Sequence, residues 1–198
     1  MFYDLNQMGG HIPKNDRRRF DDRLAEWNVM LRSTPRLQRL VLGINYRNSK
    51  EIAAQSTALL KTALPTKVLS EAPVFETGSV VEYQIKETEI LDTLCLALKQ
   101  LLSTYAARDL AVAILGVPHK RLGDDLLGRG FQVTRDVRDA ATFVGRALDL
   151  RGHERQAMVV LAPPTHRLTR NFGHAIEAYI AMSRAIRQLI IFTAEVGQ

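Results

Sequence analysis

The chain has 198 residues, of which 46% are hydrophobic and 24% charged, with a formal net charge of +6. This composition is that of a globular protein with one domain, or one and a half, and enough apolar residues for a core. A basic balance weakly favours nucleic acid or phosphorylated partners. No apolar run approaches the ~18 residues that cross a membrane, and no hydrophobic signal core opens the chain, so we expect a cytoplasmic protein. The single cysteine, Cys95, excludes an intrachain disulfide framework and lies between two leucines, as expected of a buried thiol.

The first half of the chain predicts helices and strands in alternation. Asp16 can cap a helix whose apolar residues recur at helical spacing up to Leu31. The next expected elements are a strand at 37–44, a helix at 50–63 that ends before Pro65, a strand at 80–85 and a helix at 87–105. The last of these has the strongest periodicity, with an apolar residue on one face at each turn.

The second half continues the alternation. Residues 110–115 (Leu-Ala-Val-Ala-Ile-Leu) are continuously apolar, which is typical of a strand buried on both faces of a parallel sheet. Further strands are expected at 131–134, 158–161 and 189–193, and helices at 121–127, 137–146 and 173–186. This order predicts an α/β layered fold with a mostly parallel sheet. We expect one domain over residues 35–198, with residues 1–34 as an N-terminal appendage.

One arginine stands in an apolar segment near the C-terminus. Arg184 follows the run Ala-Tyr-Ile-Ala-Met-Ser and precedes the apolar strand expected at 189–193. A guanidinium keeps its charge in proteins and needs a partner where it is desolvated. We therefore expect Arg184 to face an anion.

The Arg184 segment resembles the last conserved motif of UvrD/Rep-type superfamily 1 DNA helicases, written roughly Y-V-A-x-T/S-R-A. In that family the arginine reaches the γ-phosphate of ATP, and the resemblance implies the same role for Arg184. Three other segments resemble motifs of the same family and stand in the family's order, over nearly all of the chain.

The segment Asn45-Tyr46-Arg47-Asn48 resembles the family motif N-Y-R-S/N. The resemblance implies that Tyr46 stacks on adenine and that Arg47 contacts the γ-phosphate. Because this segment follows an expected strand, we expect it at the edge of the sheet where the parallel strands end, which is where open α/β sheets bind ligands.

The segment Arg151-Gly152-His153-Glu154 precedes an apolar strand and resembles the motif K-G-x-E. The resemblance implies that Glu154 touches the nucleotide ribose and that Gly152 belongs to the same nucleotide-binding motif, whereas a turn glycine flanked by charged surface residues is the alternative interpretation. The chain departs from the pattern at Arg151, where the family has lysine, and at Ala147, where it has a threonine of the loop that contacts DNA phosphate.

The stretch 146–174 is rich in arginine and is the candidate face for single-stranded DNA. Such a strand would be held largely through its phosphates. The candidate nucleic-acid contacts are Arg146, Arg151 and His153.

The segment Asp4-Leu5-Asn6-Gln7 resembles the motif D-x-x-Q, whose glutamine reaches the γ-phosphate and couples hydrolysis to DNA. In complete helicases this motif closes the first RecA-like domain, so we expect the chain to start where the ATP-binding half ends. No Walker A sequence, G-x-x-x-x-G-K-[ST], occurs in the 198 residues, and no Walker B acidic pair precedes Gln7. ATP with Mg²⁺ is therefore expected to be held mainly by a separate N-terminal domain, and this chain alone is expected not to hydrolyse ATP.

These resemblances predict a RecA-like, P-loop-NTPase-type three-layer α/β sandwich that lacks its own Walker A sequence. The predicted function is that of the C-terminal motor domain of an ATP-dependent DNA helicase, with single-stranded DNA and an N-terminal ATP-binding domain as partners. A stand-alone, non-catalytic module that binds nucleic acid or regulates a helicase is the alternative. A metal site is not expected, because the cysteine and histidines lack zinc-ligand spacing.

Overall fold

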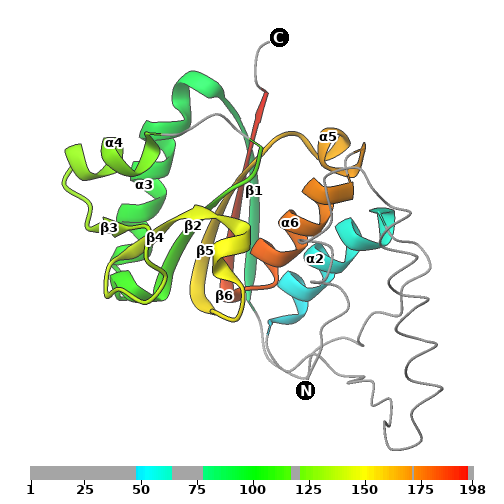
Figure 1. Ribbon diagram of the computed structural model, residues 1–198, viewed down its shortest axis with the longest axis horizontal. Coiled ribbons are helices and arrows are strands. Elements are labelled where there is room, and N and C mark those ends of the chain that lie inside the picture. The colour runs from blue at the N-terminus through cyan, green and yellow to red at the C-terminus, as the bar shows by residue number, and fades with distance from the viewer. Residues whose placement is uncertain (1–47, 64–77, 117–120, 171, 196–198) are drawn as a thin grey trace, which may run out of the picture.

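The computed structural model describes residues 48–63, 78–116, 121–170 and 172–195 (Figure 1). The helix expected near Asp16, the strand expected at 37–44 and the domain boundary expected after residue 34 lie outside these residues. So do the predicted site residues Gln7, Tyr46 and Arg47.

Strands and helices alternate along the described part of the chain. The strands are β1 (Ser79–Lys86), β2 (Leu110–Ile114), β3 (Val133–Thr134), β4 (Thr142–Arg146), β5 (Arg155–Ala162) and β6 (Ala185–Glu195). The α-helices are α2 (Lys50–Ala63), α3 (Ile90–Leu102), α4 (Leu122–Gly128), α5 (Thr165–Arg170) and α6 (Phe172–Met182). Short 3₁₀ turns occur at η2 (Glu87–Glu89), η3 (Ala107–Asp109) and η4 (Ala147–Leu150).

The six strands form one parallel sheet in the order β1-β6-β5-β2-β4-β3. Because all of them run the same way, their first residues share one edge, here called the amino edge, and their last residues share the opposite, carboxyl edge. The predicted α/β fold with a parallel sheet is confirmed.

Side chains alternate between two cores along the central strands. On β5, Met158 and Val160 belong to the core beneath α2, α5 and α6, whereas Val159 and Leu161 belong to the core beneath α3 and α4. Figure 1 shows the same division, with α3 and α4 on one side of the sheet and α2, α5 and α6 on the other. The arrangement is a three-layer sandwich, and it explains why β2, β5 and β6 are apolar on both faces.

The prediction of a helix at 137–146 is wrong. Residues 142–146 form β4, which pairs with β2, and the residues before it form a turn held by side chains. Thr134 donates to Asp139 at 2.7 Å, and the backbone N–H of Arg138 donates to the carboxylate of Asp136 at 3.0 Å. Short polar side chains that bond nearby groups in this way compete with helix formation, which explains the error.

Helix α3 follows its predicted periodicity. Ile90, Leu94, Leu98 and Leu101 are each no more than 1% exposed and form the inner face of the helix. Cys95 is also buried, as predicted, and burial raises the pKa of its thiol. None of the described helices has the length and hydropathy of a membrane-spanning segment.

Replacing Leu94 by alanine should destabilise the fold by about 2–5 kcal/mol, because it leaves a cavity in the core beneath α3. The matched control is Leu96→Ala, since Leu96 lies on the same helix but is 69% exposed; its effect should stay within about 0.5 kcal/mol. Urea denaturation measures both, and equal losses would contradict the assigned inner face.

Candidate functional site at the amino edge of the sheet

Arg184 lies in the short turn that joins α6 to β6. The amide N–H groups of Ser183 and Arg184 donate to the carbonyl groups of Tyr179 and Ala181 at 2.9 and 3.0 Å, which ends the helix. The next residue, Ala185, begins β6, so Arg184 lies at the amino edge. Its side chain is 2% exposed and is among the largest buried side chains of the described residues.

The backbone on both sides of Arg184 is held by hydrogen bonds from two other segments. The carbonyl groups of residues 183–186 each accept one. The side-chain amide of Asn48 donates to the first and third of them at 2.9 and 2.6 Å. The backbone N–H groups of Arg155 and Ser49 donate to the second and fourth at 2.9 and 3.1 Å. These four bonds, here called the carbonyl clamp, fix the path of the chain through Arg184.

A β-bulge in β6 directly follows this turn. Arg155 on β5 pairs with Ala185 on β6, but Ala157 pairs with Gln188, so β6 carries one extra residue in this stretch. An extra residue of this kind interrupts the pairing between neighbouring strands. The carbonyl of Ile186, within the bulge, is bonded to Ser49.

The residues at the start of α2 complete the carbonyl clamp. Ser49 precedes the helix, and its hydroxyl accepts from the N–H of Ile52 at 3.4 Å, the position of an N-cap residue. The N–H of Gly78 donates to the carboxylate of Glu51 at 3.0 Å. Hydrogen bonds from the backbone N–H groups of Glu51 itself and of Gly78 lower the pKa of this carboxyl group.

Arg155 is a site residue that the sequence reasoning missed. Its guanidinium is 9% exposed and donates to the carbonyl groups of Glu154 and Val137 at 2.9 and 2.5 Å. Burial lowers its pKa, and the nearby charge of Asp109 opposes that shift. The signal that identified Arg184, an arginine beside an apolar strand, was equally present at Arg155.

The turn before β5 carries four predicted residues, Arg151, Gly152, His153 and Glu154. Gly152 has a φ of 78°, which favours glycine, and a Cβ built on it meets nothing within 4 Å. Glycine is therefore required for the backbone conformation of this turn. His153 and Glu154 follow it, and Glu154 directly precedes Arg155, the residue whose N–H holds the carbonyl of Arg184. The structure thus brings Glu154 and Arg184 to neighbouring strand starts.

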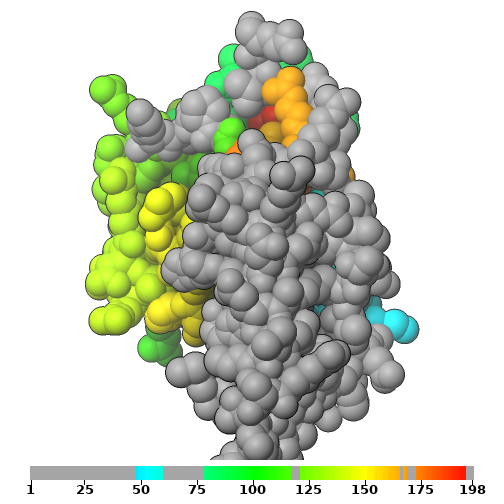
Figure 2. Space-filling view, turned by 45° about the vertical axis from the view of Figure 1, so that its right-hand side comes forward, coloured from blue at the N-terminus to red at the C-terminus, as the bar shows by residue number. Residues whose placement is uncertain are grey.

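Arg146 lies at the opposite, carboxyl edge of the sheet. It ends β4 opposite Ile114, which pairs with Leu161 on β5, so it belongs to the carboxyl edge. From Arg155 to Leu161 the strand rises about 20 Å at ~3.3 Å per residue. Arg146 therefore lies at the opposite edge of the sheet from Arg155. Figure 2 shows the yellow residues around 150 and the orange residues of α5 at separate places on the face in view.

Arg146 also forms a salt bridge with a carboxylate. Its Nε and Nη2 atoms donate to the two carboxylate oxygens of Asp149 at 3.3 and 3.0 Å, and the side chain of Arg146 is 76% exposed. The hydrogen bonds that Arg146 donates to Asp149, together with the negative charge of this carboxylate, raise the pKa of Arg146. Any phosphate that binds Arg146 must compete with this pair.

The segment that ends at Asn48 was expected at the carboxyl edge, and this expectation is wrong for the residue that the structure describes. Asn48 contacts the turn that starts β6 and so lies at the amino edge. The reason is the docking of α2, whose first turn packs against that same turn. Asn48 therefore lies at the same edge as Glu154 and Arg184, the described residues that were predicted to contact a nucleotide.

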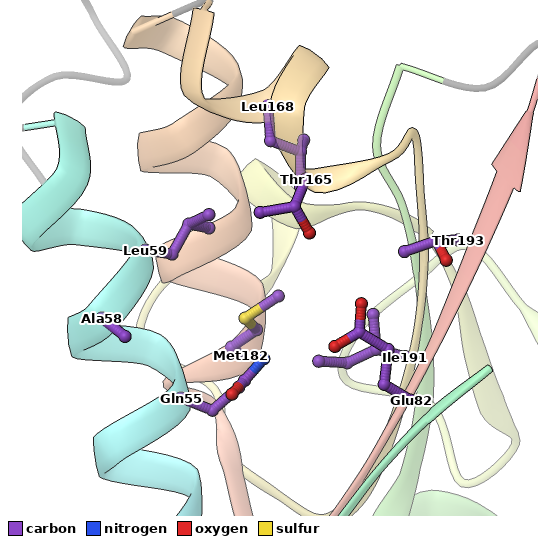
Figure 3. Close-up of a pocket in the computed structure, with 9 residues that line it drawn as sticks. All are labelled: Gln55, Ala58, Leu59, Glu82, Thr165, Leu168, Met182, Ile191 and Thr193. Atoms are coloured by element: carbon purple, nitrogen blue, oxygen red, sulfur yellow. The ribbon is translucent and has the colours of Figure 1, made fainter. Parts of the chain in front are cut away.

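A cavity of about 160 Å³ lies between β1, β6 and the helices α2, α5 and α6. Figure 3 shows Gln55, Met182 and Leu59 on one side of it, with Glu82 and Thr193 on the other. None of the predicted site residues that the structure describes lines this cavity. Among the described residues, no group of three or more histidine, cysteine, aspartate or glutamate side chains is arranged to hold a metal ion.

Comparison with known proteins identifies the fold. No protein-family model and no curated protein sequence matches the chain. Among solved structures, the chain is similar to the C-terminal domain of a possible DNA helicase from Lactobacillus plantarum WCFS1, with 16% identity and a TM-score of 0.54 over 76% of this chain and 88% of that one. At this identity the match establishes the architecture, which is consistent with the predicted RecA-like sandwich.

Replacing Gly78 by alanine should destabilise the start of β1. A Cβ there would lie 2.1 Å from the hydroxyl oxygen of Ser49 and 2.6 Å from the carbonyl of Arg187, so the backbone must shift. We expect a loss of about 1–3 kcal/mol, as for overpacking. The control is Gly123→Ala in α4, where the new Cβ meets nothing; thermal denaturation that ranks the two variants equally would contradict the close packing.

Proposed function

We propose that this chain is the C-terminal motor domain of an ATP-dependent superfamily 1 DNA helicase of the UvrD/Rep type. The carbonyl clamp carries the proposal. It joins Asn48 to Ser183 and Ala185, which are 135 and 137 residues away in the sequence. Asn48, the last residue of the segment that resembles N-Y-R-S/N, thus lies at the same edge of the sheet as Arg184. Arg47 is joined to Asn48 by a single peptide bond.

In this proposal Arg184 and Arg47 supply positive charge to the γ-phosphate of ATP that a separate N-terminal domain holds with Mg²⁺. An arginine of this kind stabilises the charge that develops on the phosphoryl group during transfer, and it needs another element to bind the nucleotide. Because Arg184 is 2% exposed, a phosphate reaches it only after neighbouring segments move aside. Domain closure on the nucleotide would provide that movement.

The remaining roles are those that the resemblance to the helicase family implies. Glu154 would contact the ribose from the turn shaped by Gly152, and Tyr46 would stack on adenine. Gln7 would sense hydrolysis. The description of the similar solved domain as part of a possible DNA helicase supports this assignment.

Single-stranded DNA is the proposed second partner. Arg151 and His153 would contact it from the amino edge, and Arg146 from the carboxyl edge. Contacts to phosphate make such binding sensitive to salt, because each one releases counterions from the strand.

A non-catalytic module that binds nucleic acid or regulates a helicase is the second candidate. The lack of a Walker A sequence in the 198 residues favours it, since nothing in that stretch can cradle the β- and γ-phosphates. The two functions differ in whether hydrolysis returns when an ATP-binding half is added.

The test is reconstitution. The chain alone should show no ATP hydrolysis, and DNA-stimulated hydrolysis should appear when it is mixed with a Walker A-bearing helicase half from the same organism. Arg184→Ala should reduce the turnover number about a thousandfold, the scale of an arginine finger.

The matched control is Arg129→Ala, because Arg129 forms an exposed pair with Asp92 in the α3–α4 layer, and it should leave the rate unchanged. Full activity of Arg184→Ala would contradict the proposed role of Arg184. A mixture without hydrolysis would favour the non-catalytic module.

DNA binding is tested by the fluorescence anisotropy of a labelled oligo(dT) between 50 and 200 mM salt, a range over which phosphate contacts lose affinity. Arg146→Ala should reduce the slope of log K against log salt by about 0.7, the value for one phosphate of a single strand. Asp149→Asn should tighten binding, because it releases Arg146 from its carboxylate. Unchanged affinity in both variants would remove Arg146 from the proposed DNA face.

A further inference from the structure

We propose that Asn48 is a positioning residue that sets the orientation of Arg184 for phosphate. This inference rests on the proposed function and adds a residue to it. Asn48 would act through the backbone of the turn, without touching the nucleotide.

The contacts of Asn48 are directed at the residues on either side of Arg184. Its side-chain nitrogen donates to the carbonyl groups of Ser183 and Ala185 at 2.9 and 2.6 Å, and the residue is 2% exposed. Both hydrogens of the amide are therefore used on the turn that carries Arg184. Hydrogen bonds in such a water-excluded site are stronger than the same bonds in water.

Asn48 is the one member of the carbonyl clamp whose contribution depends on its side chain. Ser49 and Arg155 donate through backbone N–H groups, which every residue except proline supplies. At position 48 the geometry needs two donors on one short side chain. Serine offers one, alanine offers none, and an ionised aspartate only accepts.

Asn48 also links two segments that are far apart in the sequence. Asn48 directly follows Arg47, and its neighbour Ser49 caps α2 and bonds the carbonyl of Ile186. One side chain therefore connects the segment that carries the first candidate arginine with the turn that carries the second. We therefore expect a change at Asn48 to alter the path of the turn that carries Arg184.

The experiment compares Asn48→Ala, Asn48→Ser and the control Ser56→Ala in the reconstituted ATPase. Ser56 is 1% exposed, lies in α2 and donates within its own helix, to the carbonyl of Ala53 at 3.1 Å. It therefore matches the loss of a buried polar group without touching the clamp. The turnover number and KM for ATP are measured together with the melting temperature of each variant.

We expect Asn48→Ala to lower the turnover number about a hundredfold, the effect of a small misplacement of a catalytic group, with KM changed less than about twofold. Asn48→Ser should fall between Asn48→Ala and the unmodified chain, because it retains one donor. Ser56→Ala should keep the full rate despite a comparable shift in melting temperature.

A full rate for Asn48→Ala in an Arg184-dependent mixture would overturn this inference and leave the proposed function standing. A parallel fall of rate in Asn48→Ala and Ser56→Ala, or loss of folding in both Asn48 variants, would show that Asn48 supports stability alone, and would also overturn it. If no hydrolysis depends on Arg184, the proposed function fails and this inference fails with it.

Discussion

The site depends on one constraint, which is that four successive carbonyl groups around Arg184 must each find a donor. They lie where a helix has ended and a strand has just begun, so the regular bonds of neither element are complete there. Asn48, Ser49 and Arg155 supply the donors from two other segments. Since carbonyl groups buried without partners are costly, the turn, the start of α2 and the start of β5 are fixed together. These hydrogen bonds therefore hold Arg184, and Arg155 next to Glu154, in place at the amino edge.

The candidate site residues are therefore divided between the two edges of the sheet. The amino edge holds Arg184, Glu154 and the end of the segment that carries Arg47. The carboxyl edge holds Arg146 with its carboxylate partner Asp149. The arginine-rich stretch 146–174 is continuous in sequence but crosses the layer from one edge to the other, because parallel strands require each connection to return to the starting edge.

The sequence predicted the central elements well, because burial on both faces leaves a clear pattern. The apolar run at 110–115 and the periodic helix containing Leu94 and Leu98 were confirmed. Residues 137–146 were predicted wrongly because the turn before β4 is formed by local side-chain bonds that periodicity does not detect. Asn48 and Arg155 were not identified as site residues, because their importance lies in contacts to distant backbone groups. The roles of Arg47, Tyr46 and Gln7 remain predictions from resemblance.

The clamp also affects how such a site changes during evolution. Its donors recognise main-chain oxygens, so the clamp itself sets no requirement on the side chains at 185 and 186, although burial in the core restricts the size of the residue at 185. The number of residues in the bulge is more strongly constrained. Deleting one residue there would remove the bulge, make the pairing of β5 with β6 regular and displace the carbonyl of residue 186 from the N–H of Ser49. Selection would then act on spacing more than on identity, which is compatible with a shared architecture at 16% identity.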